Sequence, residues 1–206
     1  MYVPKAFAVD DPGVAHDIIT ACGLGVIAAV DGTRPVIGYA PIALDRAKGK
    51  FGAVSFHLAK GNRLAEVLAQ GADVTISVMA ENAYISPDWY VSPDMVPTWN
   101  YVAAEIEGRA RLLSPEELSR QVDAVSAVHE ARLLPKTPWT SAKMSGKKRE
   151  GMLTMLSGFE VEIERMTAKR KLSQNRNDAD HAGVVCGLEA RGDEASRAVA
   201  KLMKRD

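Results

Sequence analysis

The residues of this sequence that could do chemistry gather in three segments, and the first runs from His57 to Arg63. Gly61 lets a ligand approach the backbone closely, and Asn62 is a good N-cap for a helix that follows. The free N–H groups and the dipole of a helix start attract anions, and Lys60 beside them adds a positive charge. The segment therefore suits a phosphate group, and it equally suits an ordinary helix start with bases at the surface.

The second segment is an aromatic loop, residues 84–101, which holds two of the three tryptophans and three of the five tyrosines. Aromatic side chains on a loop are poorly buried unless they meet a core, a partner subunit or a planar ligand. Hydroxyl and amide groups in the same loop can hydrogen-bond the edge of such a ligand. A planar-ligand site and the closure of a barrel or a dimer interface both fit this pattern. The candidate ligand contacts are Ser86, Trp89, Thr98, Trp99 and Asn100.

The third segment, Lys171 to Arg176, is a dense polar run between a predicted strand and a predicted helix. By composition alone it is more simply a surface turn, in which Ser173 or Asn175 caps the following helix. A role in binding would use Lys171, Gln174, Asn175 and Arg176.

Metal-binding and nucleophilic patterns are missing from the sequence. The four histidines, His16, His57, His129 and His181, form no pair at metal-ligand spacing, so no metal is expected. No Ser, Cys or Asp lies in a recognisable nucleophile context, so hydrolytic and acyl-transfer chemistry is not expected. No catalytic residue is identified.

Composition and charge indicate a globular cytoplasmic protein. The 206 residues include 26 basic and 26 acidic side chains, which argues against a surface built as a whole for nucleic acid or acidic membranes. The two cysteines, Cys22 and Cys186, form no disulfide framework. The N-terminus lacks the layout of a signal peptide, and no apolar run approaches the roughly 18 residues of a membrane span. We therefore expect a cytoplasmic location and no membrane association.

The elements expected to position the three segments are short strands and amphipathic helices. Val74, Ile76 and Val78 alternate with polar residues, as in a strand with one buried face, and residues 114–117 form a capping box. Antiparallel strands with inserted helices predict a small β-barrel with peripheral helices, mainly β within the α+β class. The predicted strands cover residues 26–30, 35–44, 51–56, 74–78, 102–112 and 159–163, and the predicted helices cover residues 11–22, 62–70, 114–132 and 144–156 and the chain from 177.

The three segments, in this order and at these separations, resemble the PaiB-like family of FMN-binding negative transcriptional regulators. Two long and unusual strings carry the resemblance, Val96-Pro97-Thr98-Trp99-Asn100-Tyr101 and Lys171-Leu172-Ser173-Gln174-Asn175-Arg176. The opening Met1-Tyr2-Val3-Pro4, Phe7 and the strand from Ser157 to Ile163 also fit the family pattern. The resemblance runs from Met1 to about Leu188.

The resemblance implies an FMN-binding split β-barrel of the flavin-reductase and pyridoxine-phosphate-oxidase type. The length of the chain favours a single domain, residues 1–206, with peripheral helices, and the amphipathic pattern predicts a helical C-terminal extension from about residue 177 to 206. FMN would bind near the two-fold interface of a homodimer. The phosphate would meet His57, Lys60, Gly61, Asn62 and Arg63, and the ring or ribityl chain would lie near Thr98, Trp99 and Asn100, with Ser86 and Trp89 of the aromatic loop as the other expected contacts. Lys171, Gln174, Asn175 and Arg176 would close the pocket, from the same subunit or from its partner.

The sequence departs from that family pattern in three places. Tyr39-Ala40-Pro41 replaces the common His-Leu-Pro of the second strand, which removes a histidine suited to proton transfer or haem ligation. Arg63 replaces the proline of the common Gly-Asn-Pro, where it either strengthens phosphate binding or faces solvent. The loop between Trp89 and Val96 is also shortened.

Three functions are consistent with the sequence. The first is an FMN-dependent oxidoreductase, in which the protein positions the cofactor and tunes its electrostatics. The second is a negative transcriptional regulator, either linked to flavin or a DNA-binding repressor without catalysis, supported by the basic runs Lys143–Arg149 and Lys201–Arg205. The third is a haem-binding split-barrel protein, with His57 and His181 as the conceivable axial ligands.

Overall fold

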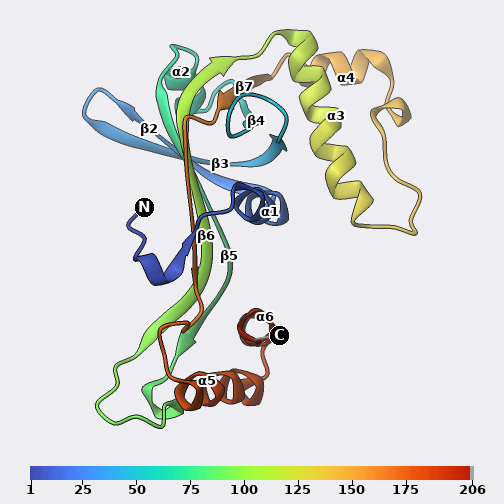
Figure 1. The fold of residues 1–206 in the computed structure, drawn as a ribbon. Helices are drawn as coiled ribbons and strands as arrows, with labels where there is room; N and C mark the ends of the chain where they lie inside the picture. The colour runs from blue at the N-terminus through green and yellow to red at the C-terminus, as the bar shows by residue number, and fades with distance from the viewer. Residues whose placement is uncertain (205–206) are drawn as a thin grey trace. The chain divides into compact units, whose positions relative to one another are not determined.

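The computed structural model describes residues 1–204, which form two compact units (Figure 1). We call the first the barrel unit, and it comprises Cys22–Ser77 and Ile106–Met166. We call the second the helical unit, and it comprises Met1–Ala21, Val78–Glu105 and the chain from Thr167 onward. The prediction of a single domain over the whole chain stays a prediction.

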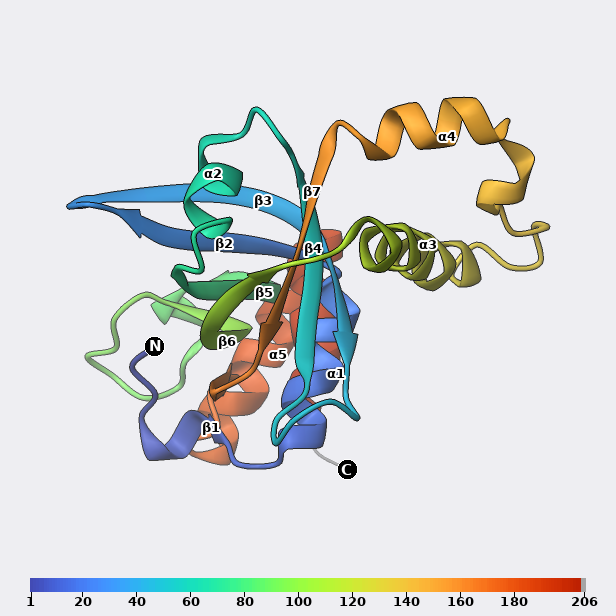
Figure 2. The same ribbon diagram turned by 90° about the horizontal axis from the view of Figure 1, so that it is seen from above.

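The barrel unit is a closed ring of six strands. These are β2 (Leu24–Asp31), β3 (Arg34–Asp45), β4 (Ala53–Ala59), β5 (Asp73–Ile85), β6 (Thr98–Leu112) and β7 (Leu156–Glu162). Their hydrogen-bonded order is β6, β5, β2, β3, β4, β7, and antiparallel pairing of β7 with β6 closes the ring. Figure 2 shows β4 and β7 side by side. Strands β5 and β6 continue into the helical unit.

Alternate side chains fill the barrel. Phe56 and Phe159 lie opposite each other on β4 and β7, with ring centroids 5.6 Å apart, and both are fully buried. Ile27 and Ile76 are paired across β2 and β5 and are buried as well. Burial of side chains of this size is worth roughly 1.5–3 kcal/mol each. The barrel core therefore follows the two-residue period of the sequence.

Three helices belong to the barrel unit: α2 (Arg63–Leu68), α3 (Pro115–Ala131) and α4 (Gly146–Leu153). The predicted capping box of α3 is confirmed, because Glu117 N donates to Ser114 Oγ over 3.2 Å and Ser114 N donates to Glu117 Oε2 over 2.8 Å. The Arg111 guanidinium at the end of β6 lowers the pKa of Glu117 to about 2. Helix α3, fixed in this way, packs against β3, β4 and β7.

The helical unit contains β1 (Ala8–Val9), α1 (Pro12–Cys22), α5 (Asp178–Arg191) and α6 (Glu194–Met203), and β8 (Arg165–Lys171) enters it from the barrel unit. Short 3₁₀ turns cover Lys5–Phe7 and Pro87–Trp89 here and Ser141–Lys143 in the barrel unit. Gly192 separates α5 from α6 in a left-handed conformation, at a φ of 72°. None of the helices in residues 1–204 has the length and hydropathy of a membrane span.

The main elements lie where the sequence predicts them, with three differences. Strands β5 and β6 are longer than predicted, and β8 was not predicted because its basic residues show no apolar alternation. The prediction that Ser173 or Asn175 caps α5 is wrong. Asn177 is the cap, and its Oδ1 accepts a hydrogen bond from Asp180 N over 2.8 Å. The predicted basic run that ends at Arg205 lies partly outside the described residues.

Strands β6 and β7 approach each other closely at Gly108 of β6, where a Cβ atom would lie 2.3 Å from the Glu162 carbonyl oxygen. We expect Gly108→Ala to lower the free energy of unfolding by about 2 kcal/mol, because a backbone group must move to admit the methyl. Gly151→Ala in α4 is the control, since nothing lies within 4 Å of that position. Urea unfolding of both variants measures the effect, and an unchanged midpoint for Gly108→Ala would contradict the close approach.

Candidate functional site

Lys171 joins the second and third of the segments that the sequence singled out. Its ammonium group, at the end of β8, donates hydrogen bonds to the Thr98 hydroxyl and, over 2.9 Å, to the Trp99 carbonyl oxygen. Thr98 and Trp99 begin β6, so the aromatic loop and the polar run meet at this ammonium group. All three residues belong to the helical unit.

Asn100 points away from this meeting place and is fully buried. Its amide nitrogen donates to Ser173 Oγ over 3.0 Å and lies 3.3 Å from Met203 Sδ. These contacts hold Ser173 in a left-handed conformation, at a φ of 61°, which is uncommon outside glycine. Asn100 therefore positions the polar run against β6 instead of facing solvent.

The opposite face of β6 presents aromatic and cationic side chains. Trp99 is 53% exposed and meets Tyr84 of β5 edge-on, with ring centroids 6.3 Å apart. The Lys169 ammonium lies 5.0 Å from the centre of the Tyr101 ring, within the range of cation–π contacts. We call these side chains the aromatic–basic face, and they are Tyr84, Trp99, Tyr101 and Lys171 at the surface together with Lys169, which is buried.

The positive charge of the aromatic–basic face is not neutralised by acidic side chains. No carboxylate of the described residues forms an ion pair with Lys169, Lys171 or Arg176. Burial lowers the pKa of the Lys171 ammonium, and the charges of Lys169 and Arg176 lower it further, while Tyr101 opposes them. An anion bound beside Lys171 would relieve this repulsion, so the face suits a ligand with aromatic and anionic parts.

Asp180 fastens the aromatic loop to the start of α5. Its carboxylate is buried and accepts hydrogen bonds from Val91 N at 2.8 Å, Ser92 N at 2.9 Å and Ser92 Oγ at 2.8 Å. The side chain of Asn177 adds a fourth bond at 2.9 Å. The Ser92 N–H is the largest cause that lowers the pKa of Asp180. The carboxylate thus stays charged and holds residues 91–92 in place.

Trp89 and Arg176 support the same loop. A Cβ atom at Gly187 of α5 would lie 2.3 Å from the Trp89 ring, and one at Gly183 would lie 2.1 Å from the Trp89 carbonyl oxygen. The indole of Trp89 therefore packs directly against the backbone of α5 at Gly187. The Arg176 guanidinium lies 5.2 Å from the centre of the Tyr90 ring.

The other predicted contacts in these segments serve local structure or point outward. Ser86 Oγ accepts a hydrogen bond from Asp88 N over 3.3 Å and caps the 3₁₀ turn that precedes Tyr90. Gln174 closes its own turn, accepting from Leu172 N over 2.7 Å and donating to the Arg170 carbonyl over 2.5 Å. Asn175 is exposed. Their predicted contact with a cofactor stays a prediction.

The first segment lies in the barrel unit, where part of it is already engaged. Asn62 caps α2 as predicted, accepting from Leu64 N over 2.9 Å. The His57 ring faces Gln121 of α3, with 2.9 Å between Nδ1 and Oε1.

Arg63 forms ion pairs with Asp31 and Glu66, and its bond to Asp31 is the largest cause that raises its pKa. The groups of this turn that remain open to a ligand are Lys60 and the backbone at Gly61, where a Cβ atom would meet nothing within 4 Å.

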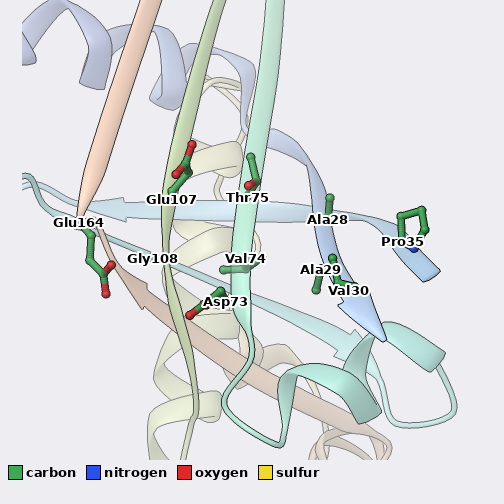
Figure 3. A pocket seen from close by; sticks show the side chains of 10 residues that line it. All are labelled: Ala28, Ala29, Val30, Pro35, Asp73, Val74, Thr75, Glu107, Gly108 and Glu164. Carbon is green, nitrogen blue, oxygen red and sulfur yellow. The ribbon is translucent and has the colours of Figure 1, made fainter. Parts of the chain in front are cut away.

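A pocket of about 450 Å³ in the barrel unit has the wrong charge for a phosphate. Figure 3 shows the carboxylates of Asp73, Glu107 and Glu164 around it, together with Gly108 and the small side chains of β2. Only Glu107 among these carboxylates has a cationic partner within the described chain, Arg165. The pocket therefore repels anions. In residues 1–204 no group of three or more His, Cys, Asp or Glu side chains is placed to hold a metal.

The sequence did not reveal the residues that hold this region together. Asp180 follows the N-cap of α5 and looks like any acidic residue of a first helical turn. Ser173 was considered as a cap and is the partner of Asn100. Gln121 lies on the α3 face that covers β4. The periodicity of α3 predicts this face, but no pattern in the sequence predicts the contact between Gln121 and His57.

The closed ring of six strands with attached helices is a split β-barrel of the kind found in flavin proteins. The structure is similar to the FAD- and haem-binding protein from Mycobacterium smegmatis, with a TM-score of 0.61 and 16% identity over 85% of this chain and 78% of that chain. It is also similar to a flavocytochrome from Azotobacter vinelandii, with a TM-score of 0.57 and 17% identity over 88% of this chain and 78% of that chain. At these identities the similarity establishes the fold.

The chain belongs to the family described as "Putative FMN-binding domain", whose profile matches residues 1–165. It is 28% identical to the protein called "Protease synthase and sporulation protein PAI 2" of Bacillus subtilis, over 99% of this chain and 97% of that protein. An uncharacterised protein of Aspergillus fumigatus is 29% identical over 74% of this chain and 72% of its own length. The predicted PaiB-like family is confirmed.

We expect Asp180→Asn to lower the urea midpoint at neutral pH, because the new amide places donors against the Val91 and Ser92 N–H groups. The pKa of Asp180 is lowered in the folded protein, so its stabilisation is present above the unfolded value of about 3.9 and is lost as the pH falls through the folded value. The variant should lack that part of the acid dependence. Asp88→Asn, exposed in the same loop, is the control. If the stability of Asp180→Asn fell with decreasing pH in the same way as that of the unchanged protein, the charge of Asp180 would not hold the loop.

Proposed function

We propose that this protein binds FMN and that the aromatic–basic face contacts the cofactor. The observation that carries the proposal is the exposed Trp99 ring on a residue whose backbone carbonyl binds the Lys171 ammonium, a cation that no described carboxylate neutralises. A planar ring can stack on an exposed indole, and an anionic group gains from an adjacent unpaired cation. Membership of an FMN-binding family supports the same conclusion. The residues on this face therefore fit a flavin.

The chemistry supported by such a site is that of an FMN-dependent oxidoreductase. FMN, when bound, supplies hydride or electron transfer, and the protein supplies position and electrostatics. Thr98 and the Trp99 carbonyl hold the Lys171 ammonium in one place, and a fixed cation near the cofactor favours its more negative redox state. Trp99 limits the access of water to one side of the site. A regulatory role linked to flavin would use the same residues for binding alone.

The working form that we propose is a homodimer, and an apolar sheet face of the barrel unit supports it. Val26 and Tyr39 are opposite each other on β2 and β3, as are Ala28 and Ile37. Tyr39 is 69% exposed and Ile37 is 58% exposed. Contiguous apolar patches of this kind usually mark an interface. The exposed large side chains of this face are Leu24, Val26, Val30, Ile37 and Tyr39.

Direct DNA binding has narrower support. Arg149, one of the four bases in the run Lys143–Arg149, is engaged by Asp123 and Ser119 of α3 at 2.8 and 2.7 Å. Lys147 and Lys148 remain exposed on α4. Promoter binding that weakens steeply with salt would favour a DNA-binding repressor, and no binding at low salt would exclude one.

We expect Lys171→Met to weaken FMN binding about tenfold, because the variant keeps the length of the side chain and removes its charge. Trp99→Ala should weaken binding to a similar degree by removing the stacking surface. Lys147→Met, exposed on α4, and Trp139→Ala in the barrel unit are matched controls. Quenching of flavin fluorescence measures each affinity. Equal affinities for Lys171→Met and Lys147→Met would contradict the assignment of this face.

We expect Ile37→Glu to convert the dimer to a monomer, because each copy of the interface would bury an unpaired charge. Val128→Glu places the same charge on an exposed position of α3 and should leave the dimer intact. Size-exclusion chromatography with light scattering gives both masses. A monomeric unchanged protein, or a dimeric Ile37→Glu variant, would rule out this interface.

A further inference from the structure

A second concave site lies in the barrel unit between α3, α4 and the start of β7. Its volume is about 470 Å³, inside the range of roughly 300–1,000 Å³ that is usual for small-molecule sites. Five leucines supply most of its apolar wall. They are Leu112, Leu113, Leu118, Leu153 and Leu156.

The base of this pocket, which we call the leucine pocket, is tightly packed. It is formed by Gly158 of β7, where a Cβ atom would lie 2.9 Å from Leu118 Cδ1 and 3.0 Å from Leu113 Cδ1. Leu113 N also donates a hydrogen bond to the Gly158 carbonyl over 2.9 Å, so the backbone beneath the pocket is satisfied. Leu112 is nevertheless 49% exposed, which leaves apolar surface open to solvent at the entrance. The pocket is therefore preformed and offers little to a polar ligand at its base.

Two opposite charges open onto the same pocket. Lys60 follows β4 and Glu150 lies on α4, and both are exposed lining residues. Neither forms an ion pair with any residue of the described chain. The Thr154 hydroxyl, also in the lining, already donates a hydrogen bond to the Gly151 carbonyl oxygen over 2.7 Å. Besides the Ser157 hydroxyl, the polar side chains of the lining that are free to meet a ligand are thus one cation and one anion.

We propose that this pocket binds an amphiphile with a zwitterionic head, such as an α-amino acid with a long apolar side chain. The apolar chain lies among the leucines, the carboxylate of the ligand meets Lys60, and its ammonium group meets Glu150. A simple carboxylate would gain from Lys60 but would be repelled by Glu150, and a simple amine would suffer the reverse. The two charges together therefore select against ligands that carry only one.

Three ligands that share one tail test the proposal: 2-aminooctanoate, octanoate and octylamine. Calorimetric titration of the full-length protein should show one site for 2-aminooctanoate, with an affinity several-fold higher than for either single-charge analogue. Equal or tighter binding of octanoate or octylamine would overturn the zwitterionic head. The absence of saturable binding by all three would overturn the pocket itself.

Two variants tie the binding to these residues, and neither position is among the expected FMN contacts. Leu112→Glu should weaken 2-aminooctanoate about tenfold by placing a charge at the apolar entrance, whereas Leu133→Glu, equally exposed beyond α3, should not. Glu150→Gln should bring 2-aminooctanoate and octanoate to similar affinities. If Leu112→Glu does not fold, Leu153→Trp fills the pocket without adding a charge. Unchanged affinities in the variants would overturn the site, whether or not the protein retains FMN.

Discussion

The hydrogen bonds of Lys171 connect the two segments on which the proposed cofactor site depends. Its ammonium group binds the Thr98 hydroxyl and the Trp99 carbonyl, so the end of β8 is fixed to the start of β6. No described carboxylate shares this charge, and the neighbouring cations Lys169 and Arg176 oppose it. The protein therefore holds a positive charge at the backbone of Trp99, whose indole is exposed, an arrangement that an anionic aromatic ligand would stabilise.

The surroundings of Lys171 limit how far these groups can move. The buried amide of Asn100 holds Ser173, and the carboxylate of Asp180 holds the backbone of residues 91–92 against α5. The glycines of α5 admit the Trp89 ring at a distance that no larger residue would allow. The site is thus positioned by buried polar groups and presented by exposed aromatic ones.

Much of the fold was predictable because local patterns specify it. The capping box at Ser114, the cap at Asn62 and the buried alternation of Val74, Ile76 and Val78 all appear where the sequence places them. The long-range partners were not predictable, since no local pattern pairs Asp180 with Ser92 or His57 with Gln121. Composition likewise could not tell that Asn100 faces inward while its neighbour Trp99 faces solvent, although strand alternation allows only one of them to be exposed.

The most direct test of the account is the visible absorption of the full-length protein after incubation with FMN and removal of free flavin by gel filtration. A flavin that stays with the protein at one per chain, and that Lys171→Met fails to retain, is the result that the aromatic–basic face predicts. A colourless unchanged protein would contradict the account, because an exposed indole and an unneutralised cation would then lack the ligand that we assign to them.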